Sequence, residues 1–383
     1  MYQRPALLTL AKSFAVFALF VTLTLGRGAE ALETKARSAM LIDAESGAVL
    51  FAKNPDAKLP PASMSKLMTA FVVFERLSQG LLSLDDELPV SEKAWRMGGS
   101  KMFVEVGSRV SIRDLLRGVI VQSGNDAAIV LAEGLAGSEA AFVREMNAMA
   151  QDLGLTGSTF ANVTGWPDPD HRMTARDLAV LARMVIERFP AYYKIYSETE
   201  FTWNGITQGN RNPLLFRNVG ADGLKTGHTR EAGYCLVASS VQEGRRLILV
   251  VMGLESKRER AEEAERLLAW GFREFARYRL FQAGEQLDEA DVWMGEEPSV
   301  PLVAPAEISV NLLRAARNEM TVKLIYQSPI PAPIEAGQEV AVLSVQAPGT
   351  PPVDFPIIAG RSVPEAGVIG RMVQGVTALL SGG

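Results

Sequence analysis

A strand, a turn and a second strand are predicted by Tyr234-Cys-Leu-Val-Ala-Ser-Ser-Val241, Glu243-Gly244 and Arg246-Leu-Ile-Leu-Val-Val-Met252. Both runs are apolar, and the Gly between them suits a tight turn, so they predict a β-hairpin. An earlier hairpin is predicted where Glu45-Ser-Gly47 separates Ala39-Met-Leu-Ile-Asp43 from Ala48-Val-Leu-Phe-Ala52.

Between the two hairpins, apolar residues recur at intervals of three and four, which predicts helices. Ser138 and Thr174 suit the N-cap positions of two of them. Two hairpins that bracket helices favour one α+β domain whose first and last strands share an antiparallel sheet. The helical segments lie near residues 62–79, 111–121, 125–136, 138–153 and 174–188, and a charged helix near 258–279 follows the second hairpin.

The composition changes after about Phe281, where prolines accumulate and short β-rich runs appear. A chain of 383 residues exceeds what one hydrophobic core usually supports, so residues 281–364 are expected to form a small all-β second domain. This segment holds eleven acidic and four basic residues, whereas residues 32–280 are neutral overall. Because no part of the chain is strongly basic, nucleic acid is not an expected partner.

Residues 1–31 have the order of a secretory signal peptide. Arg4 and Lys12 precede an apolar run that ends at Leu25, and Ala29-Glu-Ala31 follows as an A-x-A cleavage site. The alternative is an uncleaved transmembrane anchor, but the apolar run is shorter than the roughly 20 residues that a span needs. We therefore expect a mature chain that starts at Leu32 and works outside the cytoplasm.

The last segment, residues 365–383, has the apolar spacing of an amphipathic helix. Such a helix can lie at a membrane surface, although Arg371 is its only cation and it has no aromatic residue. The alternative is a helix that docks on protein. The apolar positions on one face are Val368, Ile369, Met372, Val373, Val376, Leu379 and Leu380.

Cysteine and histidine are too scarce for several kinds of site. The single cysteine, Cys235, cannot form an internal disulfide and is expected to be a buried apolar residue. The only histidines are His171 and His228, so neither a metal site nor another cofactor is expected. His171 is predicted to be a neutral, non-catalytic loop residue at the surface.

A serine nucleophile could instead use a lysine base, and Ser63-Met-Ser-Lys66 offers that pair. Residues three apart share a helical face, so the Lys66 amine can reach the Ser63 hydroxyl if its pKa is depressed. Pro60-Pro61 suits a helix start just upstream. Alone, this motif is weak, because Ser-x-x-Lys often lies on a solvated helix.

Two further motifs strengthen the assignment. Ser123-Gly124-Asn125 falls at a break between predicted helices, where a loop can project a hydroxyl and an amide into a cleft. Lys225-Thr226-Gly227 lies just before the Tyr234 strand, where an edge strand would offer a hydroxyl and an ammonium, and Gly227 would let a ligand approach the backbone closely. Ser-x-x-Lys, Ser-x-Asn and Lys-Thr-Gly, in that order, resemble the site of the penicillin-recognising serine enzymes.

The chain resembles in particular the D-alanyl-D-alanine carboxypeptidases of the low-molecular-mass penicillin-binding protein group. The resemblance is close over residues 32–280 and extends to the layout of residues 281–383. It implies a β-lactamase/transpeptidase-like domain, a β-rich stem over 281–364 and a C-terminal helix. The matching stretches are Pro61-Ala-Ser-Met-Ser-Lys-Leu-Met-Thr69, Val121-Gln-Ser-Gly-Asn-Asp-Ala127, Asp222-Gly-Leu-Lys-Thr-Gly-His-Thr229, Ala232-Gly-Tyr234 and Leu268-Ala-Trp-Gly-Phe272.

The resemblance implies roles for individual residues. Ser63 would be the acylated nucleophile, Lys66 its base and Ser123 a proton relay. Asn125 would hold the substrate amide, and Lys225, Thr226 and Gly227 would meet the carboxylate end. The backbone N–H groups of Ser63 and His228 would form the oxyanion hole. Arg260 would lie near the terminal carboxylate, with an exposed position on the charged helix as the alternative.

The resemblance also implies partners and a location. The substrates would be peptidoglycan stem peptides that end in D-Ala-D-Ala, and β-lactams would acylate Ser63. The protein would be periplasmic, with peripheral contact to the inner membrane through the C-terminal helix.

Three alternatives remain at the level of sequence. A class A β-lactamase would normally carry Ser-Asp-Asn and a loop Glu, but Gly124 replaces the Asp and residues 161–170 contain no Glu. A penicillin-binding sensor would not turn over, and the intact Ser63 and Lys66 argue against it. Endopeptidase or transpeptidase activity differs only in the bond cleaved or the acceptor.

Overall fold

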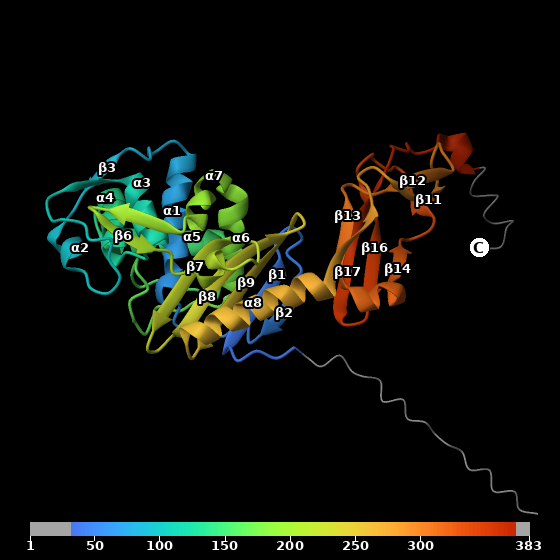
Figure 1. Cartoon of the computed structure of the whole chain (residues 1–383). Helices are drawn as coiled ribbons and strands as arrows, with labels where there is room; N and C mark the ends of the chain where they lie inside the picture. The colour runs from blue at the N-terminus through green and yellow to red at the C-terminus, as the bar shows by residue number, and fades with distance from the viewer. Residues whose placement is uncertain (1–31, 373–383) are drawn as a thin grey trace, which may run out of the picture. The chain divides into compact units, whose positions relative to one another are not determined.

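The computed structural model describes residues 32–372. An antiparallel sheet of five strands in the order β2-β1-β9-β8-β7 forms the centre of the first domain (Figure 1). Leu41 of β1 pairs with Leu249 of β9, so the first and last strands of this domain share one sheet, as predicted. The strands are β1 (Ser38–Asp43), β2 (Val49–Lys53), β7 (Ala221–Thr229), β8 (Gly233–Gln242) and β9 (Arg245–Leu254).

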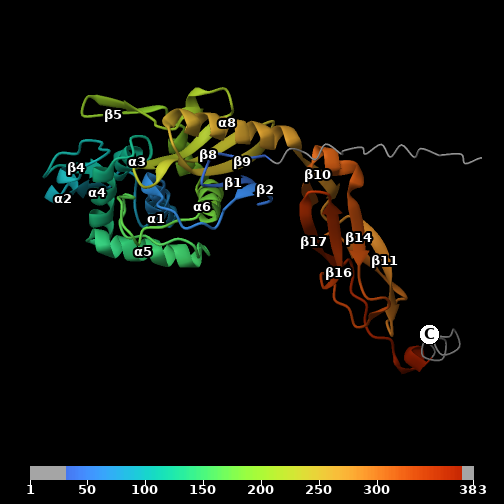
Figure 2. The ribbon, with the colours of Figure 1, turned by 90° about the horizontal axis from the view of Figure 1, so that it is seen from below.

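Helices cover both faces of this sheet. In Figure 2, α8 (Lys257–Glu274) lies on one face, and α1 (Lys66–Ser78) and α6 (Ala175–Arg188) lie on the other. Side chains of Ser138 and Thr174 accept hydrogen bonds from the first turns of α5 and α6, which confirms the predicted N-caps. The other helices are α2 (Glu92–Arg96), α3 (Ile112–Ile120), α4 (Asn125–Ala136), α5 (Glu139–Asp152) and α7 (Pro190–Tyr193).

Short elements connect these helices to the sheet. Two small two-stranded sheets and three 3-10 turns lie in the connections, and the turn before α1 contributes to the site. They are β3 (Glu87–Pro89) with β4 (Arg109–Ser111), β5 (Glu200–Trp203) with β6 (Ile206–Gly209), η1 (Ala62–Ser65), η2 (Lys194–Ser197) and η3 (Pro213–Phe216).

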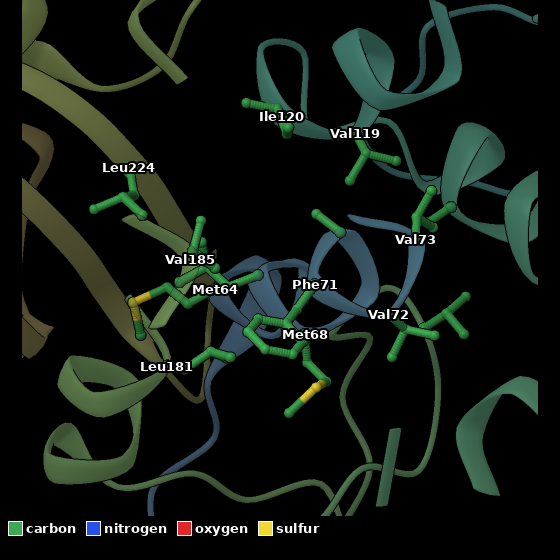
Figure 3. Close-up of a cluster of buried hydrophobic side chains, with 14 of the residues drawn as sticks. Met64, Met68, Phe71, Val72, Val73, Val119, Ile120, Leu181, Val185 and Leu224 are labelled. Atoms are coloured by element: carbon green, nitrogen blue, oxygen red, sulfur yellow. The ribbon is translucent and has the colours of Figure 1, made fainter. Parts of the chain in front are cut away.

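Helix α1 is the centre of the hydrophobic core. Its residues from Lys66 to Phe74 are all buried, so it is enclosed by other elements on every side. Figure 3 shows Phe71 and Met68 of α1 among side chains from α3, α6 and β7, including Val119, Leu181 and Leu224. Burying this many apolar side chains contributes the main stabilising free energy of the domain and holds α1, with Lys66 at its start, in one position.

The second domain is all-β, as predicted. One sheet has six strands in the order β14-β16-β17-β12-β11-β15, and a second pairs β10 with β13. Val300, Leu302, Leu343 and Ile357 belong to its own hydrophobic core. The elements are β10 (Phe275–Phe281), β11 (Gln286–Trp293), β12 (Ser299–Val303), β13 (Ile308–Leu313), η4 (Arg314–Glu319), β14 (Thr321–Ile325), β15 (Ile330–Pro331), β16 (Glu339–Ala347) and β17 (Thr350–Ala359).

One predicted helix ends earlier than expected, and two predicted segments lie wholly or partly outside the described residues. The charged helix predicted to reach residue 279 ends at Glu274, because Phe275 begins β10 and pairs with Leu313. Residues 368–372 are helical, with Ile369 81% exposed, but the rest of the predicted C-terminal helix and the predicted signal peptide lie outside the described residues. Within residues 32–372, no helix has the length and apolarity needed to cross a membrane.

Candidate active site

Ser63 and Lys66 meet at the turn that leads into α1. Ser63 lies in η1, and Lys66 is the first residue of α1, with only 1% of its surface exposed. The Lys66 Nζ lies 3.0 Å from the Ser63 Oγ, so the predicted spacing does bring the amine to the hydroxyl. Ser63 lies in a 3-10 turn rather than in the first α-helical turn, and Ala62 before it has a left-handed φ of 48°.

Two carbonyl oxygens orient the Lys66 amine. Its Nζ donates to the Oδ1 of Asn125 at 2.7 Å and to the backbone oxygen of Thr164 at 2.6 Å. The orientation of the Asn125 amide, with its oxygen toward Lys66, is fixed because its Nδ2 donates to the backbone oxygen of Gly98 at 2.8 Å. A neutral amine has two N–H groups and one lone pair. With both N–H groups on carbonyls, the lone pair faces the Ser63 hydroxyl, as a general base requires.

The environment also favours the neutral amine. The pKa of Lys66 is lowered from 10.5 to about 7, mainly by burial and to a smaller extent by the positive charge of Arg211. The carboxylate of Asp126 acts in the opposite direction on the pKa of Lys66. A substantial fraction of Lys66 is therefore neutral at physiological pH, which is the state that can accept a proton.

The second and third motifs also meet through a lysine. Ser123 lies between α3 and α4 with a left-handed φ of 61°, and its Oγ accepts a hydrogen bond from the Lys225 Nζ at 2.8 Å. Lys225 comes from the edge strand β7 and is 3% exposed. Burial lowers the pKa of Lys225, and the charges of Lys66, Arg211 and Arg260 add to this effect.

Gly227 allows β7 to lie against the turn that carries Ser63. A Cβ at this position would fall 2.7 Å from the backbone oxygen of Pro61 and 3.2 Å from Ala62, so only glycine fits. The close approach brings Thr226 and His228 to the same cavity as Ser63. The close approach at Gly227 is thus made by the protein's own turn, whereas the close approach of a ligand, which the sequence predicts there, stays a prediction.

This cavity has a volume of about 500 Å³ and a positively charged wall. Besides Ser63, Ser123, Thr226 and His228, its wall includes Arg211, Lys257 and Arg260. None of the described residues that line it is acidic. Such a cavity suits a small ligand with a terminal carboxylate beside the serine hydroxyl.

Comparison with known proteins identifies the family. Residues 26–256 match the family described as D-alanyl-D-alanine carboxypeptidase, and residues 275–365 match the C-terminal domain of penicillin-binding protein 5. The chain belongs to the D-alanyl-D-alanine carboxypeptidases. It is therefore a serine-type hydrolase of the low-molecular-mass penicillin-binding protein group, with a transpeptidase-like α+β domain followed by a β domain.

Individual members of this family are similar to the chain over most of its length. D-alanyl-D-alanine carboxypeptidase DacC of Escherichia coli is 41% identical over 351 residues, which cover 90% of this chain and 88% of that relative. DacA of Haemophilus influenzae is 38% identical and covers 88% of this chain and 87% of that relative. The crystal structure of penicillin-binding protein 5 from Haemophilus influenzae superimposes with a TM-score of 0.81 at 37% identity, covering 87% of this chain and 99% of that one.

The carboxypeptidase site contains a cation that sequence reasoning missed. Arg211 follows the β5–β6 hairpin, lines the cavity and donates to the Ser100 hydroxyl. Arg211 belongs to none of the three motifs, and its only distinguishing mark in the sequence is that an asparagine stands on each side of it. The structure shows both of these asparagines, Asn210 and Asn212, to be buried. Arg260 is 6% exposed and donates to the Arg211 backbone oxygen at 3.4 Å, so the exposed-helix alternative for Arg260 is wrong.

A second, uncharged cavity of about 270 Å³ adjoins Ser63 in the carboxypeptidase. It shares Ser63, Ser100 and His228 with the charged cavity and is also lined by Trp166 and Pro167 of the loop before α6. Trp166 is 48% exposed, and a Cβ on Gly99 would lie 3.0 Å from its ring. Ser63 therefore lies between a cationic cavity and an uncharged one.

His171 is buried rather than at the surface, contrary to the sequence-based expectation. It is 1% exposed and packs edge-on against Phe160, with ring centroids 5.6 Å apart. Burial lowers the pKa of His171 to about 4, so the imidazole is neutral at physiological pH, as expected. Cys235 is also buried, as predicted, and burial raises its pKa to about 11. Neither residue lines the cavities beside Ser63.

Proposed function

We propose that Ser63 is the nucleophile of this carboxypeptidase and that neutral Lys66 is its general base. The observation that carries the proposal is that side-chain contacts connect the three motifs. The Lys66 Nζ lies 3.0 Å from the Ser63 Oγ and 2.7 Å from the Asn125 Oδ1, and the Lys225 Nζ lies 2.8 Å from the Ser123 Oγ. The proton of the Ser63 hydroxyl passes to Lys66 as Oγ attacks the carbonyl carbon of the penultimate D-alanine. The negative charge that develops on the carbonyl oxygen is stabilised by the backbone N–H groups of Ser63 and His228.

Collapse of the tetrahedral intermediate breaks the peptide bond to the terminal D-alanine. The proton that Lys66 took passes through Ser123, which Lys225 holds in place, to the amine of the leaving D-alanine, so Lys66 becomes neutral again. Water then attacks the ester on Ser63, releases the shortened stem peptide and restores the serine hydroxyl. Several kcal/mol of the rate enhancement are expected from the preorganised oxyanion donors, with roughly 3 kcal/mol for each donor.

The cationic cavity takes the terminal carboxylate. Thr226, Arg211 and Arg260 line it together with Ser63, and Lys225 is buried beside it. The Asn125 amide nitrogen carries two hydrogens, so one donates to Gly98 while the other is offered to the substrate amide. This arrangement supports peptidoglycan peptides that end in D-Ala-D-Ala as substrates.

We propose that β-lactams acylate Ser63 and that the resulting acyl-enzyme is hydrolysed slowly. The crystal structure of Penicillin-Binding Protein D2 from Listeria monocytogenes in an ampicillin-bound form is 33% identical to this chain, with a TM-score of 0.58. Among the described residues that line either cavity beside Ser63, none is a carboxylate that could activate water. Rapid turnover of nitrocefin, at many per second, would favour the β-lactamase alternative instead.

Mass spectrometry after exposure to penicillin tests the nucleophile. A stoichiometric adduct is expected on the proteolytic peptide that contains Ser63, and the Ser63→Ala variant should lack it. Release of D-alanine from a synthetic peptide ending in D-Ala-D-Ala tests turnover. Release no faster than that of Ser63→Ala would contradict the carboxypeptidase reaction and leave the penicillin-binding sensor as the explanation.

Endopeptidase activity is a weaker candidate. A D-alanyl-D-alanine endopeptidase of Pseudomonas aeruginosa is 35% identical to this chain, but the match covers only 62% of the chain. The carboxypeptidase relatives match both domains. A cross-linked muropeptide offered beside a linear pentapeptide measures the balance directly.

We propose that the protein is exported by residues 1–31, works in the periplasm and trims stem peptides during cell-wall growth. The exposed apolar residues Val368, Ile369 and Met372 support peripheral contact of the C-terminal segment with the inner membrane. The full-length chain should float with phosphatidylglycerol-containing vesicles, and a chain that ends at Pro364 should not. A mature N-terminus other than Leu32 would revise the cleavage site.

A further inference from the structure

The loop before α6 is organised by the side chain of one residue, Asn162. Its Oδ1 accepts hydrogen bonds from the backbone nitrogens of Thr164, Gly165 and Trp166 at 3.1, 2.8 and 3.0 Å. It also accepts one from the Thr164 hydroxyl at 3.0 Å. The Asn162 Nδ2 donates to the Trp166 backbone oxygen at 3.0 Å. A single amide therefore satisfies polar groups of three consecutive residues and sets the conformation of the loop.

This loop lies directly on the catalytic turn. The backbone oxygen of Thr164 accepts the hydrogen bond from Lys66, and the Thr69 hydroxyl of α1 donates to the Val163 oxygen at 2.8 Å. A Cβ on Gly165 would fall 1.9 Å from the backbone oxygen of Ala62, the residue before Ser63. Small movements of residues 163–165 therefore move an acceptor of the Lys66 amine.

Asn162 can position the loop backbone beside Lys66, but it carries no charge that could act on the lysine. The charged groups that shift the pKa of Lys66 come from other elements, Arg211 after β6 and Asp126 of α4. Lys66 in turn lowers the pKa of Lys225 of β7 and of His171, so these two groups also face it. Asn162 is neutral and does not line either cavity beside Ser63. Asn162 can therefore act on the reaction only through the backbone that it holds, at the Thr164 carbonyl and at Trp166.

We propose that Asn162 is a positioning residue of the carboxypeptidase, which holds the Thr164 carbonyl on Lys66 and so aims the lysine lone pair at Ser63. Without the Asn162 amide, the Thr164 carbonyl no longer keeps its hydrogen bond with a Lys66 N–H, and the lysine lone pair faces the Ser63 hydroxyl for a smaller fraction of the time. The same side chain holds Trp166, so it also fixes the wall of the uncharged cavity. The inference rests on Lys66 acting as the base.

The test compares Asn162→Leu, Asn162→Asp and Asn147→Leu in the full-length chain. Asn147 is a matched control, because its side chain likewise binds backbone but at positions outside residues 162–166. It accepts from Phe160 N at 2.9 Å and donates to Phe160 O at 2.8 Å and to Val143 O at 2.9 Å. The measured quantity is the limiting acylation rate with saturating penicillin at pH 9, where Lys66 is neutral because its pKa is about 7. Thermal unfolding of each variant is recorded in parallel.

Asn162→Leu is expected to lower the limiting rate about tenfold to a hundredfold, within the range that general-base catalysis contributes. Asn162→Asp keeps an acceptor oxygen for the loop donors and should restore the rate to within about threefold of the unaltered protein. Asn147→Leu should lose stability but stay within about the same threefold.

Two results would overturn the proposal: a rate for Asn162→Leu no lower than that for Asn147→Leu, or no recovery with Asn162→Asp. A Lys66→Ala variant that still acylates at the full rate would instead overturn the proposed role of Lys66, so the two failures are distinguishable. If Asn162→Leu does not fold, Thr164→Val gives the same comparison with a smaller expected loss. It removes the bond that the Thr164 hydroxyl donates to Asn162 and the one that it accepts from the Trp166 backbone nitrogen.

Discussion

The Nζ of Lys225 donates a hydrogen bond to the Oγ of Ser123 at 2.8 Å, across 102 positions of the sequence. The bond joins the edge strand of the sheet to the break between α3 and α4. It makes two separate motifs into one functional unit, and it holds the Ser123 hydroxyl where the leaving amine is expected.

Because Ser123 and Lys225 act through one bond, their effects on catalysis should not add. Ser123→Ala and Lys225→Met are each expected to slow acylation by penicillin about a hundredfold, and the double variant should be only slightly slower than either single variant. A double-mutant cycle on acylation rates measures the coupling. Strict additivity of the two losses would show that they contribute independently.

The acylation rate should rise with pH through about 7, because the reactive form of Lys66 is the neutral amine and its pKa is about 7. Replacing Arg211 by Met removes a positive charge that lowers this pKa, so the midpoint should move to higher pH. Stopped-flow acylation at saturating penicillin from pH 5 to 10 gives the midpoint. Arg113→Met, at an exposed ion pair with Asp85, is the control and should leave the midpoint unchanged.

Gly165 and Gly154 form a matched pair for the packing of the loop on the Ser63 turn. Both have left-handed φ, of 79° and 71°, but only Gly165 lacks space for a Cβ. Gly154→Ala should lower the free energy of unfolding by about 1 kcal/mol through backbone strain alone. Gly165→Ala should lower it further and slow acylation at least about tenfold, because its Cβ would displace the backbone beside Ser63.

Urea unfolding and penicillin acylation of the two glycine variants are measured together. Equal stability and equal acylation in Gly165→Ala and Gly154→Ala would contradict the close contact between residues 62 and 165.

His171 should make the protein sensitive to acid. The unfolded chain protonates this imidazole below pH 6.5, whereas the folded chain does so only below about 4. Between these values protonation favours unfolding, so stability present above pH 6.5 is lost as the pH falls toward 4, by up to about 3 kcal/mol.

His171→Gln removes this titration, so the variant should lose less stability than the unaltered protein between pH 7.5 and pH 4.5. Urea unfolding at both pH values measures the difference, and other titrating groups cancel because they are common to both proteins. An identical loss in the two proteins would mean that the pKa of His171 is the same in the folded and in the unfolded chain, and would contradict the prediction.

Local features of the fold were well predicted, and the distant contacts of the site were not. The hairpins, the caps at Ser138 and Thr174 and the Ser63–Lys66 pair depend on neighbouring residues, so short-range patterns are sufficient to find them. The position of Arg211 and the burial of His171 depend on which loops pack together, and no short-range pattern reports this. The bonds of Asn162 are local, but the place of its loop beside Lys66 depends on the same packing.

The sequence by itself determined the α+β class, the all-β second domain, the family and the residues of the three motifs, since periodicity, turn residues and motif order are properties of the linear chain. Only the tertiary structure decided the state and direction of the lysine base. The pKa of Lys66 depends on burial in α1 and on the charge of Arg211, and its orientation depends on the carbonyls of Asn125 and Thr164. Desolvation and hydrogen-bond geometry arise only when segments far apart in the sequence are packed against one another.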